Sequence, residues 1–185
     1  MNLTINKMEN QTNPVWKHTF QSGIFLGIAL IILSLLFYVL DMHTQRWTGF
    51  ISYGALLIGI IYASVTYRDK FKNGLITYGQ SFSTGFYTGL FAAVIISLFT
   101  GIFVAAMGEQ YIESLLQQSE ETILKSNPDI TDDQLDMALN ISKRMMHPVW
   151  LSIISFAGFL IFTVIFSLIA SVFIKKEDRS LDIPE

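Results

Sequence analysis

The sequence predicts an all-α, polytopic membrane protein with four transmembrane helices and an external helical hairpin between the third and fourth. Three features predict this fold: four long runs without charged residues or His, a stripe of small residues in the third run, and a patterned polar segment before the fourth. Of the 185 residues 51% are apolar, and the mean hydropathy is +0.46, which excludes the soluble globular class.

The four runs without Asp, Glu, Lys, Arg or His are each long enough to cross a bilayer. A hydrocarbon core of about 30 Å needs roughly 20 apolar residues at a helical rise of about 1.5 Å per residue. The runs cover residues 19–40, 47–67, 73–108 and 148–174. Within them we expect spans at about 20–40, 49–67, 82–107 and 149–174, which together make a transmembrane domain over residues 19–174.

The Lys and Arg residues between the spans predict the orientation. Cytoplasmic loops carry an excess of these residues, because translocating them is disfavoured. One side of the predicted membrane has Lys7, Lys17, Arg68, Lys70, Lys72, Lys175, Lys176 and Arg179, and the other side has Arg46, Lys125, Lys143 and Arg144. We therefore expect cytoplasmic tails at 1–18 and 175–185 and an acidic, extracytoplasmic segment at 109–147. Trp47 and Trp150 would then lie at the outer interface, and Trp16 at the inner one.

The third run contains a stripe of small residues at every fourth position. Small residues let helix backbones approach closely, which favours helix association in lipid. The stripe consists of Ser81, Gly85, Gly89, Ala93, Ser97, Gly101 and Ala105. At about 100° per residue it drifts by about 40° at each step. We therefore expect a central third helix whose stripe meets different neighbours along its length.

A shorter stripe, Gly23 and Gly27, lies in the first run. The same close approach of backbones has two interpretations here. The pair could form a dimer contact between two copies of the chain, or it could pack against the third helix of the same chain. The sequence leaves both open.

The segment 109–147 has the pattern of two amphipathic helices. Apolar residues recur at helical spacing opposite a row of Glu, and the pattern stops at Asn127-Pro128. Thr131 and Gln134 then form a capping box, and His147-Pro148 ends the second helix and opens the fourth span. We expect a helical hairpin whose first arm continues the third span. We expect its apolar faces to cover each other, and the alternatives are that they cover the outer membrane surface or a partner.

No catalytic or cofactor motif is present. The sequence has no HExxH, no phosphate-binding glycine loop, no GxSxG and no cysteine. Asp41, His43, Glu109 and His147 fall near the outer interface, but their spacing does not require that they meet at a metal ion. We therefore expect no catalytic, cofactor-binding or metal-binding residues, and no enzyme. The expected partners are the lipid bilayer and a membrane protein or second copy of the chain, and no nucleic acid.

Several segments together resemble a known family. They are residues 67–68 and 73–85 (NGLITYGQSFSTG), 131–138 (TDDQLDMA), 146–148 (MHP) and the end of the last span at 174–176 (IKK). They are similar to the domain-of-unknown-function family 4199, small bacterial proteins with four predicted spans and an acidic segment before the last. The resemblance covers about residues 17–176. It implies a protein of the bacterial inner membrane and carries over no catalytic residue.

Two functions remain after these exclusions. The first is a non-enzymatic accessory or interaction subunit that presents its hairpin outside the membrane. The alternative is a small, dimeric transporter or channel that uses the polar start of the third span, with Tyr78 and Gln80 as its lining. The absence of intramembrane charge weighs against a proton-coupled transporter, because such proteins tend to place ionisable residues within their spans.

Overall fold

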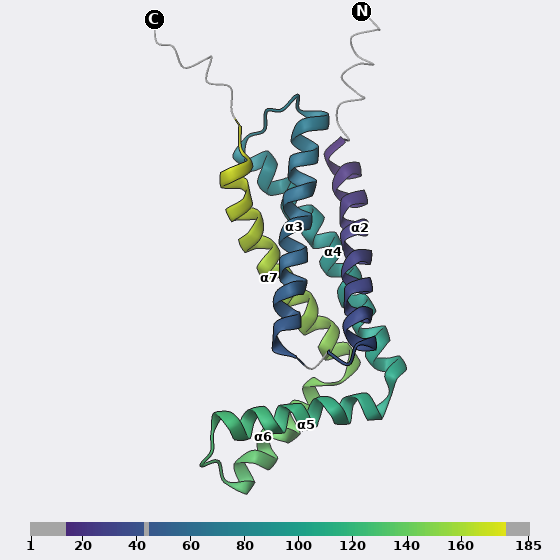
Figure 1. Cartoon of the computed structure of the whole chain (residues 1–185), viewed down its shortest axis with the longest axis vertical. Coiled ribbons are helices and arrows are strands. Elements are labelled where there is room, and N and C mark those ends of the chain that lie inside the picture. The colour runs from purple at the N-terminus through teal and green to yellow at the C-terminus, as the bar shows by residue number, and fades with distance from the viewer. Residues whose placement is uncertain (1–13, 43–44, 177–185) are drawn as a thin grey trace, which may run out of the picture.

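The computed structural model describes residues 14–42 and 45–176, and these form six helices (Figure 1). They are α2 (Pro14–Val39), α3 (Arg46–Phe71), α4 (Tyr78–Met107), α5 (Glu109–Ser126), α6 (Asp132–Met145) and α7 (Pro148–Ile174). The described residues contain no strand. Most of the two predicted tails, with Lys7 and Arg179, lies outside the described residues, as does His43.

The helices α2, α3, α4 and α7 are long and apolar enough to cross a membrane. The predicted number of spans is confirmed, and the all-α class with it. These helices lie side by side as a bundle, whereas α5 and α6 lie across one end of it (Figure 1). The chain is therefore a multi-pass membrane protein.

The bundle distributes its side chains as a protein in lipid does. Large apolar side chains point outwards, among them Phe25, Ile58 and Phe173, which are 74%, 69% and 82% exposed. The interior contains an apolar cluster around Leu56 and Ile60, and it also contains many hydroxyls. The buried polar residues are Thr19, Thr48, Ser64, Ser81, Thr84, Thr88, Ser97, Thr163, Ser167 and Ser171. Several of these hydroxyls bond to the backbone of their own helix, as Ser171 Oγ does to Ser167 O at 2.6 Å.

Helix α4 packs against each of the other three spanning helices, most extensively against α7 and then α2. Its start is fixed by the side chains of Thr77 and Gln80, which cap the first turn: Gln80 N–H donates to Thr77 Oγ1 and Thr77 N–H donates to Gln80 Oε1. α4 is thus the central helix of the bundle.

The start of α2, the α3–α4 connection and the end of α7 share one end of the bundle (Figure 1). Ile76 and Lys176 exchange two backbone hydrogen bonds of 2.9 Å, and Arg68 Nη1 donates to Ile174 O at 3.5 Å. Lys70, Lys72 and Lys175 belong to the same end, so the residues that carry the orientation argument gather there. The hairpin lies at the opposite end.

The hairpin of α5 and α6 follows the predicted pattern with one exception. The N–H of Thr131 donates to Gln134 Oε1 at the start of α6, and Pro148 stands in the first turn of α7. The expectation that the first arm continues the third span is wrong. Gly108 has φ 74° and ψ −162°, a conformation that essentially only glycine adopts, so α4 ends there and α5 leaves in a new direction.

Candidate functional site

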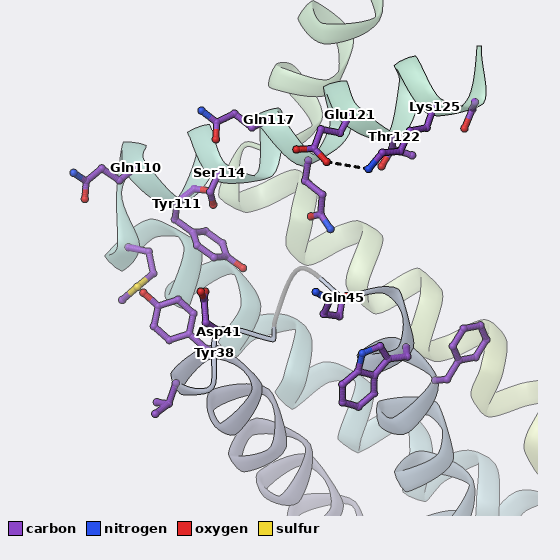
Figure 2. Close-up of a pocket in the computed structure, with 16 residues that line it drawn as sticks. Tyr38, Asp41, Gln45, Gln110, Tyr111, Ser114, Gln117, Glu121, Thr122 and Lys125 are labelled. Atoms are coloured by element: carbon purple, nitrogen blue, oxygen red, sulfur yellow. Dashed lines mark hydrogen bonds and ion pairs between the residues drawn. The ribbon is translucent and has the colours of Figure 1, made fainter. Parts of the chain in front are cut away.

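A cleft of about 1400 Å³ lies between α5 and the residues at the end of α2 and the start of α3. Figure 2 shows Tyr38, Asp41 and Gln45 on one side of it and the side chains of α5 on the other. These two walls are far apart in the sequence. The turn at Gly108 brings them together, because it lays α5 over the end of the bundle (Figure 1).

An aromatic cluster attaches α5 to the bundle. The Tyr111 ring of α5 lies 5.7 Å from that of Phe103 in α4 and 6.1 Å from that of Tyr38 in α2, and the Tyr38 and Phe103 rings are 5.1 Å apart. All three pairs have the edge-to-face geometry that aromatic rings prefer. Burial and the neighbouring Tyr38 raise the pKa of the Tyr111 hydroxyl. Tyr111 therefore packs as a neutral side chain and fixes the near end of the cleft.

The α5 wall of the cleft is polar and almost uncharged. Ser114, Gln118, Thr122 and Ser126 line it at a spacing of four residues, which places them on one helix face. Its two charged groups neutralise each other, since Lys125 Nζ lies 3.1 Å from Glu121 Oε2 (Figure 2). This face of α5 is directed towards the bundle.

The opposite wall is more apolar. It contains Val39, Trp47 and Phe50, which are 78%, 44% and 77% exposed, and Met107 from the end of α4. All four lie at ends of spanning helices, which is where aromatic residues of membrane proteins meet the lipid–water interface. The cleft thus has a hydrogen-bonding wall and an apolar wall.

The described part of the chain offers no group of three His, Cys, Asp or Glu side chains that could hold a metal ion. Asp41 lines the cleft and His147 caps α7, where its Nδ1 accepts from Val149 N–H at 3.4 Å. Glu109 begins α5. Asp41 follows the end of α2, Glu109 is the first residue of α5 and His147 precedes α7, so all three lie at helix ends.

The predicted small-residue stripe lies in the contact between α4 and α7. A Cβ added at Gly85 would lie 3.0 Å from Ser167 Oγ, one at Gly89 would overlap Thr163, and one at Gly101 would overlap Ser152. Ala93, Ser97 and Ser81, the other small residues of the stripe up to Gly101, are buried. The glycines therefore receive α7 hydroxyl side chains in places where a methyl group would not fit.

The stripe meets two neighbours along its length. At its start Ser81 O accepts from Ser64 Oγ of α3 at 3.4 Å and Gly85 contacts Ile60 of α3, and all three glycines contact α7. A row of residues four apart is inclined to the helix axis, so a helix that crosses at an angle can follow it. The sequence of α7 carried a matching signal that we did not use: Ser155, Phe159, Thr163, Ser167 and Ser171 also recur every four residues.

Four buried hydroxyls near this contact have no hydrogen-bond partner, namely those of Ser81, Thr88, Thr163 and Ser167. The side chains of Thr163 and Ser167 lie against Gly89 and Gly85, so the α4–α7 contact there is filled by close packing. Gln80, predicted as a pathway lining, is exposed and caps α4, and Tyr78 is half-buried at its first position.

Gly23 and Gly27 of α2 also pack within the chain. An added Cβ at Gly23 would lie 2.5 Å from Phe91 Cβ, and one at Gly27 would lie 2.9 Å from Ile95 Cβ, both on α4. Of the two interpretations that the sequence left open, the structure has the contact with the third span. Helix α4 therefore packs against the glycines of α2, and its own glycines pack against α7.

The comparison with known protein families gives one match. Residues 21–176 match the family described as "Protein of unknown function (DUF4199)". The chain belongs to this family. The match covers most of the first span, the other three spans and the hairpin of this DUF4199 protein. No curated protein and no solved structure matches the chain.

Proposed function

We propose that this DUF4199 protein is a non-enzymatic accessory subunit of the bacterial inner membrane that presents its α5–α6 hairpin to a membrane-protein partner. The observation that carries the proposal is the apolar row on α6. Met137, Ile141 and Met145 stand four residues apart and are 67%, 56% and 51% exposed, and neither hairpin helix has a buried residue.

The packing inside the hairpin supports this role. Leu116 and Leu139 face each other across a shared cavity, and Ser119 Oγ donates to Ser142 Oγ at 3.3 Å. The two arms therefore cover each other along this side, whereas the row on α6 stays uncovered. A second protein that covers the row would remove apolar surface from water, at about 25 cal/mol per Å².

The orientation belongs to the proposal. With the basic end in the cytoplasm, the hairpin faces the extracytoplasmic side, in agreement with the bias of Lys and Arg. Absence of enzymatic activity is supported by the chemistry of the spans, whose buried polar groups are uncharged Ser and Thr hydroxyls among the described residues.

Photocrosslinking in native membranes tests the partner. A crosslinking amino acid replaces Met137 or Ile141, and as a control it replaces Ile58 or Phe173 on the lipid face. We expect protein adducts from the two α6 positions and only lipid adducts from the controls. The yield of the protein adduct from position 137 should fall strongly when Ile141→Asp is added. It should not fall with Asn140→Asp, because Asn140 is an exposed polar neighbour. Lipid adducts alone at all four positions would refute the proposal. A second copy of the chain as the only adduct would identify a homo-oligomer.

A small dimeric transporter or channel is the second candidate. It is favoured by the four hydroxyls without partners near the α4–α7 contact and by the polar start of α4. In reconstituted vesicles this function predicts that Gln80→Ala and Tyr78→Phe reduce a measured flux. An unchanged flux in both variants would contradict it.

A further inference from the structure

A basic groove lies where the hairpin rejoins the bundle, between the C-terminal turns of α6 and the first turn of α7 (Figure 1). It has a volume of about 650 Å³ and is lined by Asn140, Lys143, Arg144, His147 and Trp150. The chain is described without a gap from α6 into α7, so these lining residues are all placed. None of them is a carboxylate, and the groove therefore presents positive charge together with hydrogen-bonding groups.

The two cations of the groove are available to a ligand. In the described part of the chain neither Lys143 nor Arg144 forms an ion pair, and both are exposed. Lys143 also borders a separate groove between the hairpin arms, whose acidic residues are Glu113, Glu120 and Asp136. These carboxylates offset part of its charge, and they do not line the groove beside Arg144. Arg144 is therefore the principal cation.

The other polar groups complete a site for an oxygen anion. His147 Nδ1 accepts from Val149 N–H at 3.4 Å, so the neutral imidazole carries its proton on Nε2, as a donor for a ligand. The Asn140 amide supplies further N–H groups. A guanidinium such as that of Arg144 presents a fork of N–H groups that matches two oxygens of a phosphate. A phosphate group can accept from all of these donors at once.

The groove lies at the edge of the membrane. Trp150 belongs to the first turn of the candidate span Pro148–Ile174, and its side chain is 54% exposed. Trp rings at the ends of spans sit at the level of the lipid headgroups, because one side is apolar and the indole N–H is polar. The cations of the last turns of α6 are therefore at the depth where phospholipids carry their phosphates.

An exposed apolar face of α7 continues from Trp150 into the span. Its residues recur at steps of three or four, which places them on one helix face. They are Ile154, Ala157, Ile161, Ile165, Leu168 and Val172, all of them exposed. A lipid whose headgroup occupies the groove can lay an acyl chain along this face. A free phosphate or an acidic peptide would leave the face unused, so a phospholipid matches both parts of the surface.

The positive charges also select among phospholipids. A choline or ethanolamine headgroup brings its own cation close to Arg144 and Lys143, which repel it. A headgroup without a cation, such as phosphatidylglycerol, meets no such repulsion and keeps its net negative charge for the groove. The charge of the groove therefore favours an anionic lipid over a zwitterionic one.

We propose that this groove binds the phosphate of an anionic phospholipid. Arg144 is the main phosphate ligand, Lys143 and His147 add to it, and the glycerol and first acyl carbons lie against Trp150. The site goes beyond the accessory role proposed above, because it requires neither a protein partner nor the apolar row of α6. It also does not depend on which side of the membrane the hairpin faces.

Quenching of Trp150 fluorescence tests the site. The chain has three Trp residues, so Trp16→Phe with Trp47→Phe leaves Trp150 as the only one. The full-length protein is placed in nanodiscs of phosphatidylcholine that contain a rising fraction of one brominated lipid, either phosphatidylglycerol or phosphatidylcholine. Bromine on the upper acyl chain quenches a Trp that it contacts. We expect brominated phosphatidylglycerol to quench more strongly and to saturate at a low fraction, since a site concentrates it beside Trp150.

Substitutions in this single-Trp protein separate the site from general attraction of the lipid. Arg144→Gln should raise the half-saturating fraction of phosphatidylglycerol about tenfold, roughly the loss of one charge-assisted hydrogen bond. Arg144→Lys keeps the charge but not the fork and should have an intermediate effect. Lys125→Gln is the matched control, because it removes one charge from the same hairpin at a side chain that is 77% exposed and outside the groove. It should leave the quenching curve unchanged.

Each outcome has a defined meaning. Preferential quenching by phosphatidylglycerol that is weakened by Arg144→Gln and unaffected by Lys125→Gln supports the site. Equal quenching by the two brominated lipids, or the same half-saturation in Arg144→Gln and the parent, would overturn it. An equal loss in Arg144→Gln and Lys125→Gln would also overturn it, because the lipid would then follow the net charge of the hairpin. The photocrosslinks from α6 do not depend on any of these results.

Discussion

At the scale of single residues, the absence of a methyl group decides how closely α4 and α7 approach. Gly85, Gly89 and Gly101 each leave space that a hydroxyl side chain of α7 fills. Lipid tails compete with apolar side chains on equal terms, so close van der Waals packing of this kind is a main source of stability between membrane helices. The cost of adding one carbon there measures how tight the contact is.

Gly89→Ala should therefore destabilise the bundle. The new Cβ overlaps the branched Thr163 side chain, and overpacking of this kind costs about 1–3 kcal/mol. Gly54→Ala is the matched control, because nothing lies within 4 Å of the position of its Cβ. Thermal unfolding of both variants in one detergent checks the prediction. Equal midpoints for the two variants would show that the α4–α7 contact is loose.

Gly108 has the opposite property, since space is free around it and its backbone is what matters. Gly108→Ala places a Cβ on a residue with φ 74°, at a cost of about 1–3 kcal/mol. The cost falls on the turn between α4 and α5, so we expect faster proteolysis within residues 109–147 while the bundle keeps its helical content. Gly79→Ala, with equal space but no positive φ, is the control. Equal cleavage rates would mean that the turn does not need glycine.

At the scale of elements, the position of α5 depends on Tyr111. Tyr111→Phe keeps the ring against Phe103 and should keep α5 in place, whereas Tyr111→Ala removes the contact and should free the near end of the helix. Loss of an aromatic side chain from a packed site costs about 3–5 kcal/mol when it is fully buried, and less here because Tyr111 is half-buried. Hydrogen exchange of α5 amides compares the two variants. Similar exchange rates would contradict the role of Tyr111 as an anchor.

The same tyrosine predicts a pH dependence. Its pKa is raised in the folded protein, so folding favours the neutral form. The stabilisation is complete below the ordinary tyrosine pKa of about 10 and is lost as the pH rises through the raised value. Exchange of α5 amides, corrected for the intrinsic effect of pH, should therefore increase above about pH 10 in the parent but not in Tyr111→Phe.

The sequence predicted the elements themselves well, and their relative arrangement only in part. Runs without charge marked the spans, and Asn127-Pro128 with the Thr131–Gln134 cap marked the hairpin. The direction of α5 was missed because a single glycine between two helical patterns does not reveal its φ angle. The stripe was expected to meet several neighbours, but α7 was not named among them, because Phe159 interrupts the row of hydroxyls on α7.

The cleft could not be predicted from the sequence. Its walls come from residues such as Gln45 and Ser114, which are distant in the chain and meet only because α5 turns over the bundle. A row of Ser, Gln and Thr on α5 is visible in the sequence, but such a row is usually a solvated face. The structure adds that apolar side chains from the ends of the spans lie opposite this row.

At the scale of the whole molecule, the protein has two ends of different chemistry. One end contains the basic residues Arg68, Lys70, Lys72, Lys175 and Lys176. At this end two backbone hydrogen bonds join Ile76 to Lys176. The other end carries the acidic hairpin and the cleft. The partner proposed for α6 requires that this second end faces outwards.

Labelling of single cysteines tests this orientation most directly, and the absence of native cysteine makes it clean. Asp129→Cys places a thiol in the turn between α5 and α6, and Leu75→Cys places one in the exposed α3–α4 connection. In spheroplasts, a membrane-impermeant maleimide should label Asp129→Cys at once and Leu75→Cys only after the membrane is permeabilised. Labelling of Leu75→Cys but not Asp129→Cys before permeabilisation would place the hairpin in the cytoplasm and contradict the account.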